Sequence, residues 1–365
     1  MVPGLRGPRC WQSAVLRVMM VRGVFEVEAM RILVVGGAGY IGSHMVKRLT
    51  RDGHEVVVLD NLSTGHREAA RFGEMVEGDL ADSALLDRLL GQRPFAAVMH
   101  FGAYSQVGES SQEPAAYYRN NAAYTLNLLD AMRAHAVHLL VFSSTAAVFG
   151  EPTYIPIDES HPLHPLNPYG RSKRMVEEIL ADYEQAYGLH WAALRYFNAA
   201  GADPEGDLGE QHEPETHLIP IVLQVASGRR SELQVFGDDY DTPDSTCIRD
   251  YVHVTDLCDA HALALDYLCS GRPSRAWNLG TDAGFSVREV IDAARRVTGR
   301  AIPVRMMPRR PGDPARLVAD SAAARRDLGW RPQFPDLETM ISHAWRWECR
   351  MRDGDLPLTK GVPAR

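Results

Sequence analysis

Short apolar strands alternate with helical segments through the first half of this chain, and that alternation constrains its fold more than any other feature. Apolar runs occupy residues 31–35 (RILVV), 55–59 (EVVVL), 95–100 (FAAVMH), 139–143 (LLVFS) and 192–196 (AALRY), with amphipathic stretches between them. Strands that alternate with helices at this spacing form β-α-β units and a parallel sheet. We therefore predict an α/β protein built on a Rossmann-type doubly wound parallel sheet.

The chain has 365 residues, which is enough for more than one domain. Its composition changes after about Asn198. Residues 199–216 are rich in glycine, proline and acidic side chains, and shorter helix and strand patterns follow. We expect a smaller α/β lobe to begin there. The predicted ranges are 30–198 for the large domain, 199–350 mainly for the lobe with some return to the large domain near 249–254, and 351–365 for a tail.

Residues 1–29 differ from the rest of the chain. They carry four arginines and no acidic residue before Glu26. Their apolar stretch at 14–21 is interrupted by Arg17, so it does not fit the unbroken apolar region of a signal peptide. We expect a disordered tail, or an extension upstream of a natural start at Met30.

Charge and composition exclude several kinds of partner. The net charge of −8 argues against nucleic acid, because phosphate binding needs a basic surface. No apolar run approaches the ~20 residues that a membrane-spanning helix needs. The five cysteines form no C-x-x-C pair, so we expect a reduced protein of the cytoplasm without a disulfide framework or a metal site.

A glycine-rich turn follows the first strand and opens the first helix. Residues 36–42 (GGAGYIG) satisfy the pattern G-x-G-x-x-G, which lets a pyrophosphate approach main-chain N–H groups at a helix N-terminus. Asp60 ends the second strand, where a carboxylate accepts hydrogen bonds from an adenosine ribose and repels a 2′-phosphate. The turn and the acid together predict NAD rather than NADP, although His66 and Arg67 lie near enough to leave NADP open.

One lysine stands at a spacing that suggests chemistry. Of the 39 basic residues only Lys47, Lys173 and Lys360 are lysines, and Lys173 follows Tyr169 by four residues, so both side chains lie on one helix face. A phenol must lower its pKa by about 3 units, or about 4 kcal/mol, to act as a base near pH 7. A cation ~6 Å away supplies about 3 kcal/mol at an effective dielectric of ~20. The lysine alone falls short, so the pair makes most sense beside a positively charged oxidised nicotinamide. We expect Lys47 and Lys360 at the surface.

Several motifs together resemble the extended short-chain dehydrogenase/reductase family. They are residues 36–42, 143–150 (SSTAAVFG), the pair Tyr169 and Lys173, and 195–198 (RYFN). The closer resemblance is to the UDP-glucose 4-epimerases of that family, and it covers essentially all of residues 30–350. It is supported by stretches at 60–65, 77–80, 100–103, 107–110, 117–121, 235–237, 249–253 and 278–280.

The resemblance implies a reaction and a role for three residues. The reaction is reversible C4 epimerisation of a UDP-hexose, UDP-glucose or UDP-galactose, through a 4-keto intermediate with tightly bound NAD. Tyr169 is implied to be the general base for the sugar 4-hydroxyl, and Lys173 to lower the pKa of Tyr169 and hold the nicotinamide ribose. Thr145 is implied to hydrogen-bond the same hydroxyl. The resemblance also implies a homodimer, with helices over 117–134 and 169–187 as candidates for its interface.

The resemblance further implies two sets of binding residues. Those for NAD are Gly36, Gly39, Tyr40, Ile41, Gly42, Asp60, Asn61, Ser63, Thr64, Gly65, Asp79, Leu80, Phe101, Gly102, Ala103, Ser105, Asn120, Ser143, Tyr169, Lys173 and Phe197. Those for the nucleotide sugar are Thr145, Tyr169, Asn198, His217, Leu218, Val235, Phe236, Arg249, Arg310 and Asp313. Arg249 and Arg310 suit a pyrophosphate through bidentate hydrogen bonds.

Other activities on the same scaffold stay open or are disfavoured. Leu317 falls near a position that gates the sugar pocket in the family and has intermediate bulk, so epimerisation of a UDP-N-acetylhexosamine or a UDP-pentose stays an alternative. Related dehydratases and decarboxylases carry acidic residues where this chain has Ala146 and Ala147, and a methyl group cannot move a proton. A non-catalytic NAD-binding regulator is a further alternative, which the intact tyrosine and lysine disfavour.

Overall fold

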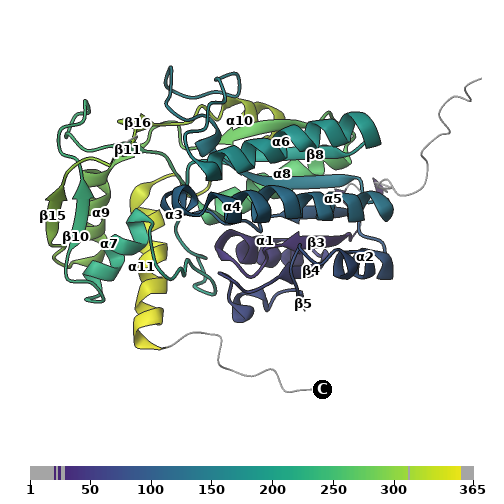
Figure 1. The fold of residues 1–365 in the computed structure, drawn as a ribbon. Helices are drawn as coiled ribbons and strands as arrows, with labels where there is room; N and C mark the ends of the chain where they lie inside the picture. Colours follow the sequence, from purple (N-terminus) through teal and green to yellow (C-terminus); the bar gives the residue numbers. More distant parts are fainter. Residues whose placement is uncertain (1–19, 22–23, 26–28, 311–312, 355–365) are drawn as a thin grey trace, which may run out of the picture.

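The computed structural model describes residues 20–21, 24–25, 29–310 and 313–354. Its main element is a seven-stranded parallel sheet with the order β13-β8-β7-β6-β3-β4-β5 (Figure 1). The strands are β3 (Arg31–Val35), β4 (Glu55–Asp60), β5 (Glu74–Glu77), β6 (Ala97–His100), β7 (Leu139–Thr145), β8 (His190–Tyr196) and β13 (Arg275–Leu279). The chain adds β4 and β5 on one side of β3 and then returns to add β6 on the other. That reversal makes the sheet doubly wound and confirms the predicted fold class.

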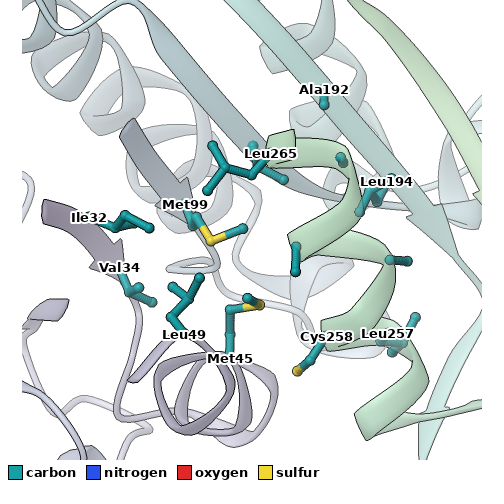
Figure 2. Packing of buried hydrophobic residues seen from close by; sticks show 14 of the residues in the cluster. Ile32, Val34, Met45, Leu49, Met99, Ala192, Leu194, Leu257, Cys258 and Leu265 are labelled. Atoms are coloured by element: carbon teal, nitrogen blue, oxygen red, sulfur yellow. The ribbon is translucent and has the colours of Figure 1, made fainter. Parts of the chain in front are cut away.

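Helices cover both faces of this sheet. One face packs against α1 (Tyr40–Arg51) and α8 (Val254–Cys269), and the other against α2 (Ser83–Gln92), α5 (Tyr124–Ala134) and α6 (Pro168–Tyr187). Alternate residues of β3 supply the two cores: Ile32 faces α1, while Leu33 faces the opposite layer. Figure 2 shows the first core, where β3 meets Met45 and Leu49 of α1 and Leu265 of α8 lies close by. Burial on both faces explains the continuous apolar runs in the sequence.

Shorter elements connect the sheet to its helices. Between β6 and α5 lie α3 (Val107–Gln112), α4 (Pro114–Tyr117) and a π-helical turn (Tyr118–Ala123), so the expected helix over 117–134 is continuous but changes its winding. Single 3₁₀ turns occur at Arg67–Ala70 and Ala146–Val148. Helix α6 begins cleanly because the Asn167 side chain accepts a hydrogen bond from the N–H of Gly170, and Pro168 occupies the first turn.

The smaller lobe lies at one end of the large sheet (Figure 1). Its apolar core joins α7 (Leu218–Ala226), α9 (Val287–Thr298) and α11 (Leu337–Asp353) to the parallel pair β10 (Leu233–Phe236) and β15 (Val304–Met307). A second small sheet places β11 (Ile248–Arg249) between β14 (Phe285–Ser286) and β16 (Arg316–Leu317).

The chain crosses between the two units in a way that composition did not reveal. Near the expected return, β12 (Tyr251–His253) pairs with β9 (Asn198–Ala200) rather than with the large sheet. Helix α8 and strand β13 then pack onto the large sheet, with α10 (Ala322–Leu328) against them. The large unit therefore takes two helices, α8 and α10, and an edge strand from the range 199–350. A change in composition marks a loop, but it does not tell which sheet a later strand joins.

Lys47 corrects an expectation, because the structure buries it instead of leaving it at the surface. Its ammonium lies 2.7 Å from Asp203, 3.0 Å from Glu205 and 2.8 Å from Asp207, and its side chain is 5% exposed. The three acids belong to the loop that leaves β9. Lys47 therefore ties α1 to the start of the 199–216 segment.

Both chain ends lie largely outside the described residues. Within the range 1–29, β1 (Met20–Val21) pairs antiparallel with β2 (Val24–Phe25). Most of the expected N-terminal extension, most of the expected tail and Lys360 lie outside the described part. Among the helices of the described ranges, none is both long and apolar enough to cross a membrane.

Candidate active site

A cavity of about 1520 Å³ is bounded by residues of both the large sheet and the smaller lobe. Its wall takes in the glycine turn, the carboxyl ends of β4, β7 and β8, the start of α6, and residues of α7, β10, β11 and the segment around Arg310. Carboxyl ends of parallel strands at a reversal of strand order are where ligands bind in open α/β sheets. Every residue predicted to bind NAD or the nucleotide sugar lines this cavity except Gly65.

Gly65 lies behind the wall. A methyl group on it would come within 2.9 Å of the main-chain carbon of Ala38, and the next residue, His66, donates its N–H to the Ala38 carbonyl at 2.9 Å. The position therefore requires glycine for close packing under the glycine turn. The structure does not bring Gly65 to the cavity, although its neighbours Ser63 and Thr64 do line it.

The glycine turn is shaped to accept a ligand closely. Gly36 has φ +78°, and a Cβ there would lie 2.4 Å from the nitrogen of Gly102. A Cβ on Gly42 would lie 2.1 Å from the Gly36 carbonyl oxygen, so neither position tolerates a side chain. Helix α1 begins after Gly39 with no side-chain cap, which leaves its first N–H groups for an anionic group.

Asp60 is fixed at the end of β4 by two main-chain donors. Its oxygens accept hydrogen bonds from the N–H groups of Leu62 at 2.8 Å and Ala38 at 3.0 Å. The two nearby basic side chains have other partners: Arg67 pairs with Glu77, and His66 contacts the carbonyl of Gln211. Neither of these two basic side chains lines the cavity, so the site offers a carboxylate and not a cation where a 2′-phosphate would lie.

Tyr169, Lys173 and Thr145 meet at one point of the wall, where α6 starts beside the end of β7. The Lys173 ammonium donates to the carbonyl of Ser143 at 2.8 Å and lies 4.6 Å from the centre of the Phe142 ring. Burial lowers the pKa of Lys173 to about 7, against the attraction of Glu177. Burial raises the pKa of Tyr169, and a hydrogen bond with Thr145 opposes that rise. The protein alone thus keeps the phenol protonated, in line with the estimate that lysine by itself falls short.

Two residues near this point were missed by the sequence reasoning. The hydroxyl of Tyr196 lies 2.5 Å from that of Ser143, beside the carbonyl that holds Lys173. Glu177 lies one helical turn after Lys173 and is paired with Arg195. Tyr196 and Arg195 both belong to the motif RYFN, and Glu177 has the i+4 spacing, so these signals were available in the sequence.

The lobe side of the cavity carries the two predicted arginines. Arg249 on β11 forms an ion pair with Asp313, and the Arg310 guanidinium lies 3.9 Å from the centre of the Phe236 ring. The Asn198 amide donates to the carbonyl of Asp250 at 2.8 Å. Two arginines on one wall suit a diphosphate.

His217 belongs to a network of acids and histidines that the sequence reasoning also missed. Its Nδ1 lies 2.5 Å from Glu210, and His212 lies 3.2 Å from the same carboxylate. Burial opposes protonation, but the carboxylates of Glu210 and Glu215 raise the pKa of His212 to about 10. Two imidazolium ions then balance two carboxylates. Their ligand atoms all lie within 4.8 Å of one another, a spacing that a metal ion would accept.

A doubly wound sheet whose glycine turn, acidic strand end and Tyr–Lys pair share one cavity defines a dinucleotide-dependent enzyme of the short-chain dehydrogenase/reductase type. The comparison with family models is more specific. The chain belongs to the NAD dependent epimerase/dehydratase family, whose model matches residues 32–280.

Individual relatives match over nearly their whole length. The chain is 53% identical to the UDP-glucose 4-epimerase of Halalkalibacterium halodurans over 318 residues, which are 87% of this chain and 95% of that protein. Among solved structures, the UDP-glucose 4-epimerase of Brucella ovis in complex with NAD superimposes with a TM-score of 0.85 at 52% identity, covering 87% and 98% of the two chains. The enzyme of Bifidobacterium longum in complex with NAD⁺ and UDP gives 0.84 at 38% identity, covering 89% and 99%. The predicted resemblance is confirmed.

Proposed function

We propose that this chain is an NAD-dependent enzyme that reversibly inverts C4 of a UDP-hexose, interconverting UDP-glucose and UDP-galactose. One observation carries the proposal: the glycine turn with Asp60, the pair Tyr169 and Lys173, and the two arginines of the lobe all line a single cavity. Relatives about half identical to this chain bear the name UDP-glucose 4-epimerase, and solved relatives hold NAD, or NAD⁺ with UDP.

The residues present fit NAD. The tightly packed glycine turn opens α1, whose first N–H groups have no side-chain cap and suit a pyrophosphate, and the fixed Asp60 carboxylate suits a free ribose 2′-hydroxyl. When bound, NAD would supply the hydride acceptor and donor for C4 and would end each turnover unchanged. The remaining NAD contacts proposed for this chain are those of the predicted set that line the cavity.

The chain's own residues move the proton. Tyr169, as the phenolate, takes the proton of the sugar 4-hydroxyl as C4 is oxidised and gives it back when the 4-keto sugar is reduced, so the phenolate is restored. Lys173, fixed by the Ser143 carbonyl, favours the phenolate, and Thr145 positions the hydroxyl through its hydrogen bond with Tyr169. Ala146 and Ala147 line the cavity beside these residues. An alanine side chain cannot donate or accept a proton, which supports epimerisation over dehydration.

Arg249 and Arg310 bind the diphosphate of the substrate, and Phe236 offers an apolar face near them. Leu317 lines the same cavity, so it is placed to limit the substituent that the sugar carries. UDP-N-acetylhexosamines and UDP-pentoses therefore stay as alternative substrates.

We also propose that the protein is a cytoplasmic homodimer. Helices α5 and α6 present Leu126, Met175 and Tyr187 to solvent, each more than a third exposed, and a second copy would cover them. The four cysteines of the described part are free thiols, which suits a reducing compartment.

Product analysis tests the function directly. The purified protein is incubated with UDP-glucose, UDP-galactose, UDP-N-acetylhexosamines and UDP-pentoses without added NAD, and the products are separated by chromatography. We expect interconversion of UDP-glucose and UDP-galactose. Accumulation of a 4-keto-6-deoxy sugar would replace the epimerase with a dehydratase, and released NAD without any product would favour a non-catalytic regulator.

A further inference from the structure

A buried ion pair lies directly behind the proposed active site. Glu177 of α6 and Arg195 of β8 have side chains only 6% and 7% exposed, and they meet through two contacts, Nε to Oε1 at 3.0 Å and a terminal nitrogen to Oε2 at 2.5 Å. The Ser144 hydroxyl donates to the same carboxylate at 2.5 Å. A buried pair of this kind adds little stability relative to an apolar pair, because both ions lose their hydration. The position of this ion pair behind the site therefore suggests a role other than stability.

The role suggested by the structure concerns the neighbouring Lys173. Glu177 follows Lys173 by four residues on α6, so the two side chains lie on the same helix face. The Lys173 ammonium has a hydrogen bond to the Ser143 carbonyl, while Ser143 and Ser144 are neighbours on β7. The ammonium and the carboxylate are thus held by consecutive residues of one strand. Burial and the attraction of Glu177 together leave the pKa of Lys173 at about 7, where a small change in the local field alters its charge.

The other titratable groups around Lys173 do not replace Glu177. His100 on β6 is held by Thr125, and burial and Lys173 lower its pKa to about 3, so it is neutral. Burial raises the pKa of both Tyr169 on α6 and Tyr196 on β8, so both phenols are neutral in the protein alone. Among the described residues, Glu177 is the carboxylate that attracts Lys173.

We propose that Glu177 is a positioning residue of the active site. Its carboxylate keeps Lys173 charged, and Arg195 holds that carboxylate in place and weakens its attraction for the Lys173 ammonium. The link to turnover rests on the proposed function. The effect on the charge of Lys173 does not, because it involves only residues of this chain and needs no turnover.

The scarcity of lysine makes a direct measurement feasible. Full-length protein with its bound NAD is prepared with ε-¹³C-lysine, and its three lysine signals are followed by NMR across a pH titration. The signal that Lys173→Arg removes belongs to Lys173. We expect Glu177→Gln to lower the Lys173 midpoint by about one unit, a tenfold change in the charged-to-neutral ratio, because an unpaired Arg195 cation remains nearby. Arg195→Met should raise it, because Glu177 is then unneutralised.

Shifts of the Lys173 midpoint in opposite directions distinguish an effect of charge from an effect of packing. Both variants should lower the melting temperature, since each leaves a buried charge unpaired, but only a charge effect moves the Lys173 midpoint in opposite senses. Glu184→Gln is the matched control: this glutamate is on the same helix and accepts a hydrogen bond from Trp191 at 3.0 Å. It should leave Lys173 unchanged, and Arg195→Lys should keep the midpoint near that of the wild type.

An unchanged Lys173 midpoint in Glu177→Gln, or shifts of the same sign in both variants, would overturn the proposal. If Arg195→Met does not fold, Glu177→Gln and Arg195→Lys still decide it. If no UDP-sugar is converted but the midpoints shift as expected, the proposed function fails and the role of Glu177 stands.

Discussion

The side chain of Asp60 accepts a hydrogen bond from the main-chain N–H of Ala38 at 3.0 Å, across 22 residues of sequence. The contact joins the end of the second strand of the large sheet to the middle of the glycine turn. The acid proposed to bind the ribose is therefore also part of the structure that shapes the proposed pyrophosphate site. If both assignments hold, one carboxylate couples recognition of the two halves of the cofactor.

Asp60→Asn should weaken NAD binding at least about tenfold and reduce the preference for NAD over NADP, because the amide lacks the charge that repels a 2′-phosphate. The measurement is the NAD content of the purified protein together with the two dissociation constants. Asp52→Asn is the control, since Asp52 is exposed and pairs with Arg48 on the outside of α1. A full NAD content and an unchanged preference in Asp60→Asn would contradict the assignment.

Tyr169→Phe should keep NAD and lower the epimerisation rate by about 10²–10⁴-fold, the usual contribution of a positioned general base. The turnover rate and the NAD content after denaturation report the two effects separately. Tyr154→Phe serves as the matched control, because that phenol is exposed and bonded to Asp158. Near-normal turnover of the Tyr169 variant would remove its role as the base.

Lys173→Arg should cost at least about 100-fold in rate although it keeps the positive charge. The lysine side chain is buried between the Ser143 carbonyl and the Phe142 ring, and a planar, forked guanidinium does not fit a contact made by a compact ammonium. Steady-state kinetics with a parallel measurement of bound NAD would test this. Wild-type activity in the variant would show that only the charge matters.

Lys47→Met should destabilise the protein by roughly 2–4 kcal/mol, because it leaves three carboxylates facing one another. The figure lies below that for a fully buried pair because Glu205 is half-exposed. The melting temperature at pH 7 measures it, with Arg296→Met as the control, because Arg296 forms an exposed ion pair with Glu338 outside this cluster. Equal melting temperatures for the two variants would contradict the prediction.

The pH dependence of this ion cluster has a definite sign. Burial raises the pKa of Asp203, but hydrogen bonds from Lys47 and the main chain of Asp207 outweigh it and leave the pKa lowered. A lowered folded-state pKa gives stability that is present above the ordinary carboxyl pKa of about 4 and is lost as the pH falls below it. The difference in melting temperature between the wild type and Lys47→Met should therefore shrink as the pH falls below about 4. A difference that grows on acidification would show that another group dominates.

The sequence by itself determined the parallel sheet, the glycine turn with its acid, and the pairing of Tyr169 with Lys173. Each of these follows from a local period: apolar runs of strand length, glycines at fixed spacing, and two side chains four residues apart on a helix. Only the tertiary structure decided that β13 joins the large sheet beside β8, that Lys47 is buried against acids more than 150 residues away, and that Arg195 holds Glu177 behind the active site. The physical reason is that burial and ion pairing depend on which distant segments of the folded chain lie in contact. Local sequence patterns do not specify those long-range contacts.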